Sequence, residues 1–318
     1  MPSDEGVSAV DEAALERRLA ALRAAAASDA AGMFGPRSMM WRVDREAATF
    51  LGAGRALLLQ LAHPWVAAAI AEHSRTLADP IGRFHRTFGI VFTLVFGTAA
   101  QATAAARRLH RRHAGITGHL PEAAGRFAAG SPYRANDQAA LAWVHATLIE
   151  TAVMAHDLVL PPLGAREIEQ YYAEARRFAG FFGIAEERVP QHWSDFAAYC
   201  AAMQASDTLA VSAAARGIAE AIFAGAGPVP AVPHWYRALT ARLLPERLRD
   251  GFGLAYGEGE RQSAERALAW ISRAYPLLPR RLRFVGPYQE AERRLAGRPP
   301  GLLTEIANRV WIGQPRMR

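Results

Sequence analysis

The sequence contains no lysine, so all 37 of its basic side chains belong to arginine. The formal net charge is +7 at pH 7, and acidic residues are interleaved with the arginines along most of the chain. Nucleic-acid-binding proteins usually gather lysine and arginine into patches. The even spread predicts solvated helix faces and no nucleic-acid partner. A basic face for another anionic partner stays open as an alternative.

Several chemistries are excluded by missing residues. Cys200 is the only cysteine, so no intramolecular disulfide can form, and the C-x-x-C-H motif of covalent haem attachment is absent. The sequence also lacks the G-x-S-x-G motif of serine hydrolases and the H-E-x-x-H motif of zinc proteases. The chain therefore does not resemble a disulfide-stapled secreted domain or a common hydrolase.

No hydrophobic run is long and clean enough to predict a membrane span, which needs about 20 predominantly apolar residues. Leu51–Ala71 has the right length but is interrupted by Arg55, Gln60, His63 and Pro64. The first five residues are acidic in character and do not resemble a secretory signal. We therefore expect a cytoplasmic protein with no stable membrane insertion.

The residues that are abundant favour helices. Apolar residues make up 51% of the chain, alanine is frequent, and β-branched residues are scattered. Apolar periodicity, caps and Gly/Pro breaks predict helices at Val10–Ala27, Trp41–Phe50, Arg55–Ala62, Asp79–Phe96, Ala99–His113, Asp137–Leu158, Ala165–Phe182 and Ser194–Met203. Gly118–Asn136 is expected to be a loop, and no strand pair with turn chemistry stands out.

We therefore predict an all-α fold consisting of a single multi-helix globular domain. Residues 1–33 are expected to form an N-terminal helical arm, and residues 34–225 the core. Residues 226–318 are expected to add a C-terminal helical layer to the same domain.

The first candidate site is carried by Arg83, Arg86 and Thr87. Their spacing of i, i+3 and i+4 places all three on one face of a helix, and the next residues on that face are apolar. A buried arginine is costly unless it meets an anion or a carboxylate. The alternative is an ordinary ion pair, with Asp79 or Glu72 as the partner.

The second candidate is His113, near the end of the following helix, and His110 lies one turn earlier on the same helix. Two histidines at this spacing can bind a metal, although no carboxylate–histidine set accompanies them. The alternative is an exposed basic helix end, which the helix dipole favours. His145 is expected to be a core histidine, and His63 and His73 are expected to be structural.

A length argument connects the two sites. Thr87 lies ten residues before Gly97, and His113 lies sixteen residues after it. If the two helices are antiparallel, these residues lie roughly 15 Å and 24 Å from the turn and can share one pocket. A histidine facing cationic donors across an apolar interior suits a bound haem. The histidine nitrogen holds the iron, and the donors act on an iron-bound oxygen species.

A series of short segments occurs in a fixed order along the chain: Phe34-Gly35-Pro36 with Trp41-Arg42, Gly54 to Pro64, His73-Ser74, Asp79-Pro80, Arg83-x-x-Arg86-Thr87, His113 with Gly118, Tyr133-x-Ala135-x-Asp137, Trp143 to Thr147, Tyr171-Tyr172 and Leu243-Leu244-Pro245. Taken together, these segments resemble the MpaB-like oxygenase family, which includes the rubber oxygenases called latex clearing proteins. The resemblance covers roughly residues 34–285.

The resemblance implies an all-helical fold around a b-type haem, with residues 34–225 as the haem-binding oxygenase core. His113 falls on the position of the proximal iron ligand, and Arg83, Arg86 and Thr87 fall on the distal set. His113, Arg83 and Thr87 are then the residues that contact the cofactor. In the rubber oxygenases the middle distal position is a lysine that can reach the iron. Arg86 stays protonated and has no lone pair to donate, so we expect no protein ligand on the distal side.

The sequence thus predicts a haem-dependent oxygenase that acts on a small apolar or terpenoid-like substrate with dioxygen. A redox partner is possible, but the sequence does not identify it. Arg83 and Arg86 are expected to stabilise a reduced oxygen species, and Thr87 to orient it by hydrogen bonding. Two alternatives stay open. One is a haem-binding or sensor protein without turnover, and the other is a structural helical protein without a cofactor.

Overall fold

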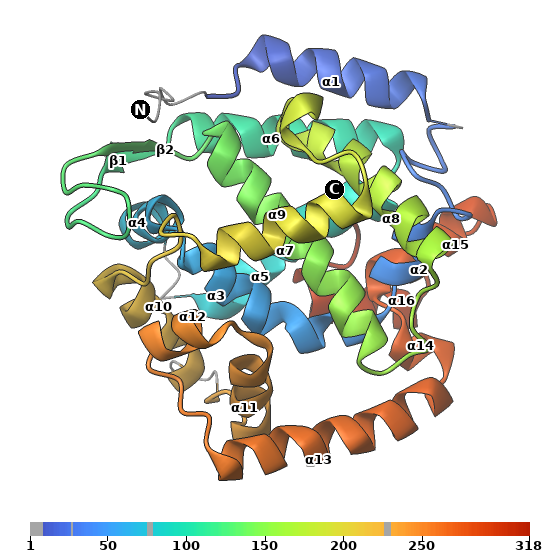
Figure 1. The fold of residues 1–318 in the computed structure, drawn as a ribbon. Helices are drawn as coiled ribbons and strands as arrows, with labels where there is room; N and C mark the ends of the chain where they lie inside the picture. The colour runs from blue at the N-terminus through green and yellow to red at the C-terminus, as the bar shows by residue number, and fades with distance from the viewer. Residues whose placement is uncertain (1–8, 27, 75–78, 226–229) are drawn as a thin grey trace.

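Helices account for nearly all regular structure in the computed structural model, which describes residues 9–26, 28–74, 79–225 and 230–318 (Figure 1). The α-helices are α1 Glu12–Ala24, α2 Met39–Asp44, α3 Ala53–Leu61, α4 Pro64–His73, α5 Pro80–Phe96, α6 Ala99–Ala114, α7 Gln138–Asp157, α8 Ala165–Ala179, α9 Trp193–Ala205, α10 Ala213–Ala224, α11 His234–Leu243, α12 Glu246–Gly251, α13 Glu258–Ala274, α14 Arg280–Arg283, α15 Gly286–Leu295 and α16 Leu302–Ile312. Short 3₁₀ turns are η1 Ala47–Gly52, η2 Gly180–Phe182, η3 Glu186–Arg188 and η4 Tyr275–Leu277. The prediction of a single, mostly helical domain is confirmed.

Helix α7 runs through the middle of the molecule and is buried along most of its length (Figure 1). Asp137 caps its start, as predicted, by accepting a hydrogen bond of 2.9 Å from the Ala140 amide. The Trp143 indole donates to the Leu59 carbonyl at 2.9 Å, which ties α7 to α3. His145 lies 2.8 Å from the Ala175 carbonyl on α8 and is a core histidine, as expected.

Helices α5 and α6 form an antiparallel pair joined by the tight turn predicted at Gly97-Thr98. The Thr98 hydroxyl accepts from the Gln101 amide at 3.1 Å, and the Gln101 side chain accepts from the Thr98 amide at 2.9 Å. This capping box satisfies two amides that the first turn of α6 leaves without intrahelical partners. The sequence therefore sets both where α5 ends and where α6 turns back.

The N-terminal arm buries Leu15, Leu19 and Leu22 and lies across α6 (Figure 1). An ion pair of 2.6 Å between Arg107 on α6 and Glu16 on α1 joins the two helices. The helix predicted at Val10–Ala27 is shorter at both ends, and the first eight residues lie outside the described chain.

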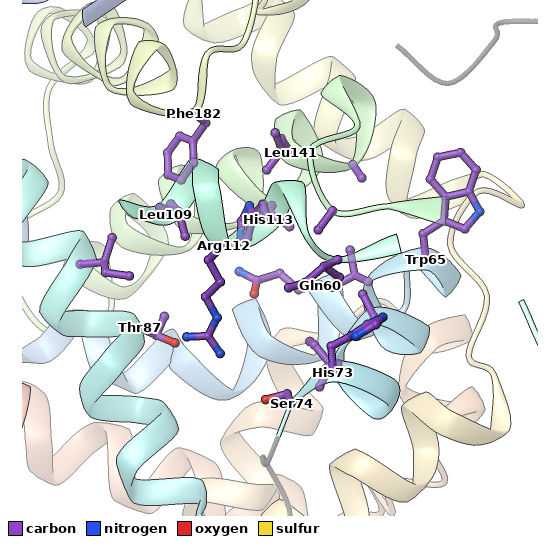
Figure 2. A pocket seen from close by; sticks show the side chains of 18 of the residues that line it. Gln60, Trp65, His73, Ser74, Thr87, Leu109, Arg112, His113, Leu141 and Phe182 are labelled. Atoms are coloured by element: carbon purple, nitrogen blue, oxygen red, sulfur yellow. The ribbon is translucent and has the colours of Figure 1, made fainter. Parts of the chain in front are cut away.

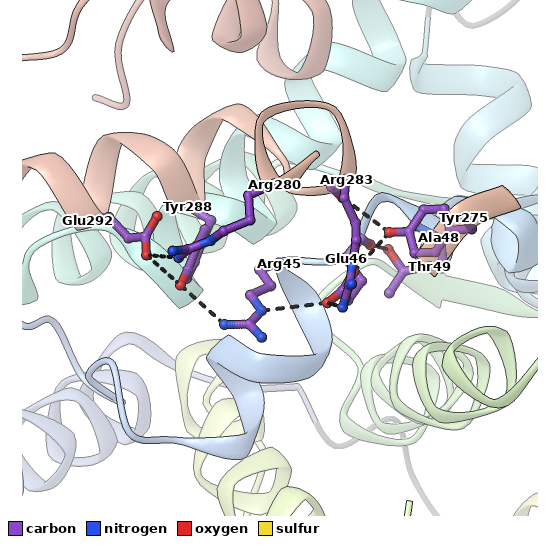
Figure 3. Close-up of polar contacts among 9 residues, drawn as sticks. All are labelled: Arg45, Glu46, Ala48, Thr49, Tyr275, Arg280, Arg283, Tyr288 and Glu292. Carbon is purple, nitrogen blue, oxygen red and sulfur yellow. Dashed lines mark hydrogen bonds and ion pairs between the residues drawn. The ribbon is translucent and has the colours of Figure 1, made fainter. Parts of the chain in front are cut away.

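The C-terminal helices are joined to the rest of the molecule by a buried polar network (Figure 3). Glu46, which is 1% exposed, accepts two hydrogen bonds of 2.8 Å from the Arg283 guanidinium and one of 2.9 Å from the Tyr275 hydroxyl. Arg45 stacks over the ring of Phe284, with its guanidinium carbon 4.4 Å from the ring centroid. The segment before α3 is thereby linked to residues over 200 positions later. The domain boundaries at residues 33 and 225 stay predictions.

Two expectations about local structure were wrong. The segment Gly118–Asn136, expected to be a loop, carries a two-stranded antiparallel sheet, in which β1 Thr117–His119 pairs with β2 Pro132–Arg134. The helix expected at Trp41–Phe50 is divided into α2 and η1 around Arg45-Glu46. The chain breaks there because the Glu46 side chain turns inward to Arg283, a partner that local sequence cannot indicate.

The apolar side chains form one main core shared by most of the helices. Cys200 on α9 lies within this core and is fully buried. None of the helices in the described ranges combines the length and apolar character needed to cross a membrane.

Candidate functional site

A pocket opens between α4, α5, α6 and α7, next to the β1–β2 hairpin (Figure 2). It encloses about 1370 Å³ of space free of protein atoms, a volume that includes its mouth. Its walls are mostly apolar and are formed by Trp65, Val66, Ala69, Ile70, Ile90, Val91, Leu109, Ile116, Leu141, Val144, Leu148 and Phe182. A hollow with such walls suits a ligand that is largely apolar.

His113 lines this pocket from the last turn of α6 (Figure 2). Burial lowers the pKa of His113 to about 4, and the nearby charges of Arg112 and His110 add to this effect. The imidazole is therefore neutral at pH 7, with a lone pair available for a metal. Its ring makes no hydrogen bond to any residue that the structure describes.

Arg83, Arg86 and Thr87 line the same pocket from α5, so the structure brings together all four predicted site residues. The Arg83 guanidinium donates to the Ser74 hydroxyl at 2.9 Å. Arg86 forms an ion pair of 2.9 Å with Asp79, the N-cap of its own helix, so one partner expected in the alternative interpretation is confirmed. This contact lowers the pKa of the Asp79 carboxyl, and the Gly82 amide lowers it further.

The two histidines of α6 differ in their surroundings because they lie on different sides of the helix. His110 does not line the pocket, and its Nδ1 lies 3.4 Å from the Asn136 side-chain nitrogen. His73, expected to be structural, does line the pocket, but its Nε2 lies 3.1 Å from the Thr117 carbonyl oxygen. Nε2 of His73 is thereby engaged with the hairpin, whereas the ring of His113 is free.

Sequence reasoning missed several polar residues of the pocket: Gln60, Ser74, Arg112 and Arg134. Arg112 was interpreted only as part of a basic helix end. Figure 2 shows its side chain extending from α6 across the pocket, toward the side where Thr87 lies. The signal available in the sequence was its position next to His113, but only the packing of α5 against α6 distinguishes it from the neighbouring Arg111.

Besides the contact of His73 with Thr117, a short hydrogen bond holds the hairpin against α4, donated at 2.5 Å by the Tyr133 hydroxyl to the Glu72 carboxylate. A Cβ at Gly118 would lie 2.5 Å from the Tyr133 oxygen and 2.7 Å from the Glu72 oxygen. Glycine is therefore required at this position of β1 for the two side chains to meet. Glu72 itself is not a lining residue of the pocket.

The arrangement can be compared with known families. The family model described as "ER-bound oxygenase mpaB/B'/Rubber oxygenase, catalytic domain" matches residues 41–274, which include every predicted site residue. The chain belongs to this oxygenase family. No curated protein and no solved structure matches it. The family resemblance expected from the sequence is thus confirmed, and family membership indicates an oxygenase.

The donor set of this oxygenase domain fits a haem better than a bare metal ion. Within the described ranges, no three His, Cys, Asp or Glu side chains come together as a metal site. A single free histidine is insufficient for an iron ion, but a porphyrin brings four nitrogen ligands of its own. The apolar walls suit the faces of the porphyrin, and the arginines suit its carboxylates.

Proposed function

We propose that the protein is a b-type haem-dependent oxygenase that acts on a small apolar or terpenoid-like substrate, and that His113 would bind the haem iron. The observation that carries the proposal is the neutral, unpartnered imidazole of His113 in an apolar pocket that also contains Arg83, Arg86 and Thr87. Cys200 is buried on α9 and is not a lining residue, so haem attachment through it is not expected.

The bound haem supplies the redox chemistry with dioxygen, and the protein supplies binding, orientation and charge. His113 holds the group in place from α6. Arg83 and Arg86 provide positive charge on the α5 side, where negative charge on oxygen is stabilised. The Thr87 hydroxyl makes no hydrogen bond within the described chain, so it is free to bond to a ligand.

The apolar wall determines which substrates fit. Most of the side chains of α4, α5 and α7 that face the hollow are aliphatic or aromatic, and the side-chain nitrogen of Gln60 is engaged by a 2.9 Å hydrogen bond to the Thr147 hydroxyl. A substrate with few polar groups is favoured, because a polar substrate would lose its hydrogen bonds to water on entry.

The ligand assignment is tested by haem content. We expect the purified protein to carry acid-extractable haem with a Soret band, and His113→Ala to lose it. His110→Ala and His73→Ala are the matched controls and should keep most of the haem, because His110 lies outside the pocket and His73 is bonded to the hairpin. Loss of haem in a control variant but not in His113→Ala would refute the assignment.

Turnover is tested separately from binding. Oxygen consumption and product formation should be measured with a reductant and a series of apolar and terpenoid-like compounds. A haem-loaded protein that consumes no substrate-dependent oxygen would support the non-catalytic haem protein instead.

A further inference from the structure

The pocket carries more positive charge than the proposed reaction uses, because Arg112 and Arg134 line it in addition to Arg83 and Arg86. Four arginines line it, from α5, α6 and β2: Arg83, Arg86, Arg112 and Arg134. No aspartate or glutamate is among the lining residues that the structure describes. Arg83 is half-buried, whereas Arg86, Arg112 and Arg134 are exposed to solvent. Like charges gathered along one pocket attract an anion to it.

The arginines differ in how far their charge is already matched. Arg86 is paired with Asp79 at 2.9 Å. Arg83 donates to the Ser74 hydroxyl at 2.9 Å, so its guanidinium is already engaged. Arg112 forms no ion pair or hydrogen bond through its guanidinium with any described residue, although it extends across the pocket toward α5 (Figure 2). Arg112 is therefore the guanidinium best placed to bind an anion from outside the chain.

Arg83 and Arg112 are close enough to influence one another. Burial lowers the pKa of Arg83, and the charges of Arg112 and Arg86 lower it further. An anion between these groups would relieve the repulsion between the two guanidinium groups and would lie beside the proposed iron ligand.

We infer that Arg112, together with Arg83, forms a carboxylate-binding subsite at the polar side of this pocket. The planar guanidinium matches a carboxylate with two parallel hydrogen bonds, and the apolar walls require the rest of the ligand to be apolar. Two ligands combine these features: a haem through its propionates, and an apolar acid bound as substrate. If the carboxylate is a haem propionate, the inference rests on the proposed function. If it belongs to an apolar acid bound as substrate, the inference is independent of the haem.

The first arm of the test uses haem and haem dimethyl ester, which differ only in whether the propionates are charged. Both are titrated into the protein freed of bound haem, and the dissociation constants are read from the Soret band. If Arg112 binds a propionate, Arg112→Met should weaken haem binding about tenfold and leave binding of the ester unchanged. Arg111→Met is the matched control, because Arg111 is adjacent on α6 but does not line the pocket.

The second arm uses dodecanoic acid and its methyl ester, titrated by calorimetry into the protein as purified. If the subsite binds a substrate carboxylate, Arg112→Met should weaken binding of the acid and not of the ester, and haem binding should be unaffected. Arg111→Met should again match the unaltered protein.

The two arms distinguish the possible failures. Equal effects of Arg112→Met on acid and ester forms in both arms, or no effect in either, would overturn the subsite. A protein that binds neither haem nor its ester contradicts the proposed function, and the dodecanoic acid arm then decides the subsite alone.

Discussion

Substitution of Arg86 tests whether the side chain at this position can bind the haem iron. Arginine keeps its proton at any working pH and has no lone pair for iron, whereas lysine can lose its proton when buried. We predict that the unaltered ferric protein has a high-spin or water-bound spectrum at neutral pH, and that Arg86→Lys adds a low-spin component in absorption and electron paramagnetic resonance spectra.

The neighbouring Asp79 provides the control for this change. Asp79 is 2.9 Å from Arg86 and would hold a lysine in its charged form. Arg86→Lys combined with Asp79→Asn should therefore increase the low-spin fraction, while Asp79→Asn alone should not produce one. A low-spin spectrum with two nitrogen ligands in the unaltered protein would rule out this explanation.

Individual site residues could be predicted from the sequence to the extent that one helix determines them. The spacing of Arg83, Arg86 and Thr87 placed them on a common face, and the count of residues around Gly97 brought His113 to the same pocket. Arg112 could not be predicted in this way. Its environment depends on which side of α6 faces α5, and its neighbours Arg111 and His113 offer no local pattern that reveals this.

At the scale of elements, the contact between Glu46 and the C-terminal helices invites a quantitative test. Its carboxylate is buried and accepts hydrogen bonds from Nε and Nη2 of the Arg283 guanidinium. Glu46→Gln keeps the shape but leaves Arg283 without a counter-charge. We expect the free energy of unfolding to fall by roughly 3–5 kcal/mol, measured by denaturant titration.

The control is an ion pair of the same chemistry on the surface. Glu258 and Arg261 are exposed and pair within one turn of α13. Glu258→Gln should leave stability unchanged within error, because solvent screens such pairs. Equal effects of the two substitutions would show that the network in Figure 3 is not the stabilising link.

Helix boundaries could be predicted where a capping residue marks them, but not where contacts with distant residues determine where the helix ends. Asp79, Thr98 and Asp137 each begin a helix with a side-chain hydrogen bond, as their positions in the sequence indicate. The hairpin was missed because its strands have three residues each and are separated by a long loop without turn chemistry at their ends. Its position depends on Tyr133 and Glu72, which only the folded chain brings together.

For the whole molecule, we predict one cooperative unfolding transition. The network around Glu46 and the shared main core join residues from the N-terminal arm to α16. In the protein freed of haem, the calorimetric and van't Hoff enthalpies should therefore agree. A chain ending at residue 225 should not fold independently. Two resolved transitions, or a stable shortened chain, would instead place a domain boundary at the C-terminal layer.

Stability should fall as the pH is lowered from about 6.5 toward 4. Burial lowers the pKa of His63, His113 and His145 to about 4, so the unfolded chain binds protons in this range that the folded chain does not. Asp44 and Glu290 act in the opposite direction, because burial raises the pKa of Asp44 to about 7 and also raises that of Glu290. A net uptake of roughly one to two protons on unfolding is expected.

The measurement is the free energy of unfolding at several pH values, followed for the unaltered protein and for His145→Gln. Glutamine can still donate to the Ala175 carbonyl but does not titrate, so the variant should show a shallower slope by about one proton. A free energy of unfolding that rises as the pH is lowered would show that Asp44 and Glu290 outweigh the histidines.

The single thiol on α9 gives the molecule a built-in reporter of its own motions. Cys200 is fully buried, and burial raises its pKa, so neither access nor ionisation permits modification in the closed state. A thiol reagent can therefore react only during moments when α9 separates from α7 and α8. When reclosing is faster than labelling, the rate of mass increase gives the equilibrium constant of that opening. One time course on the unaltered protein thus measures a local free energy at a known position, with no engineered cysteine and no competing thiol.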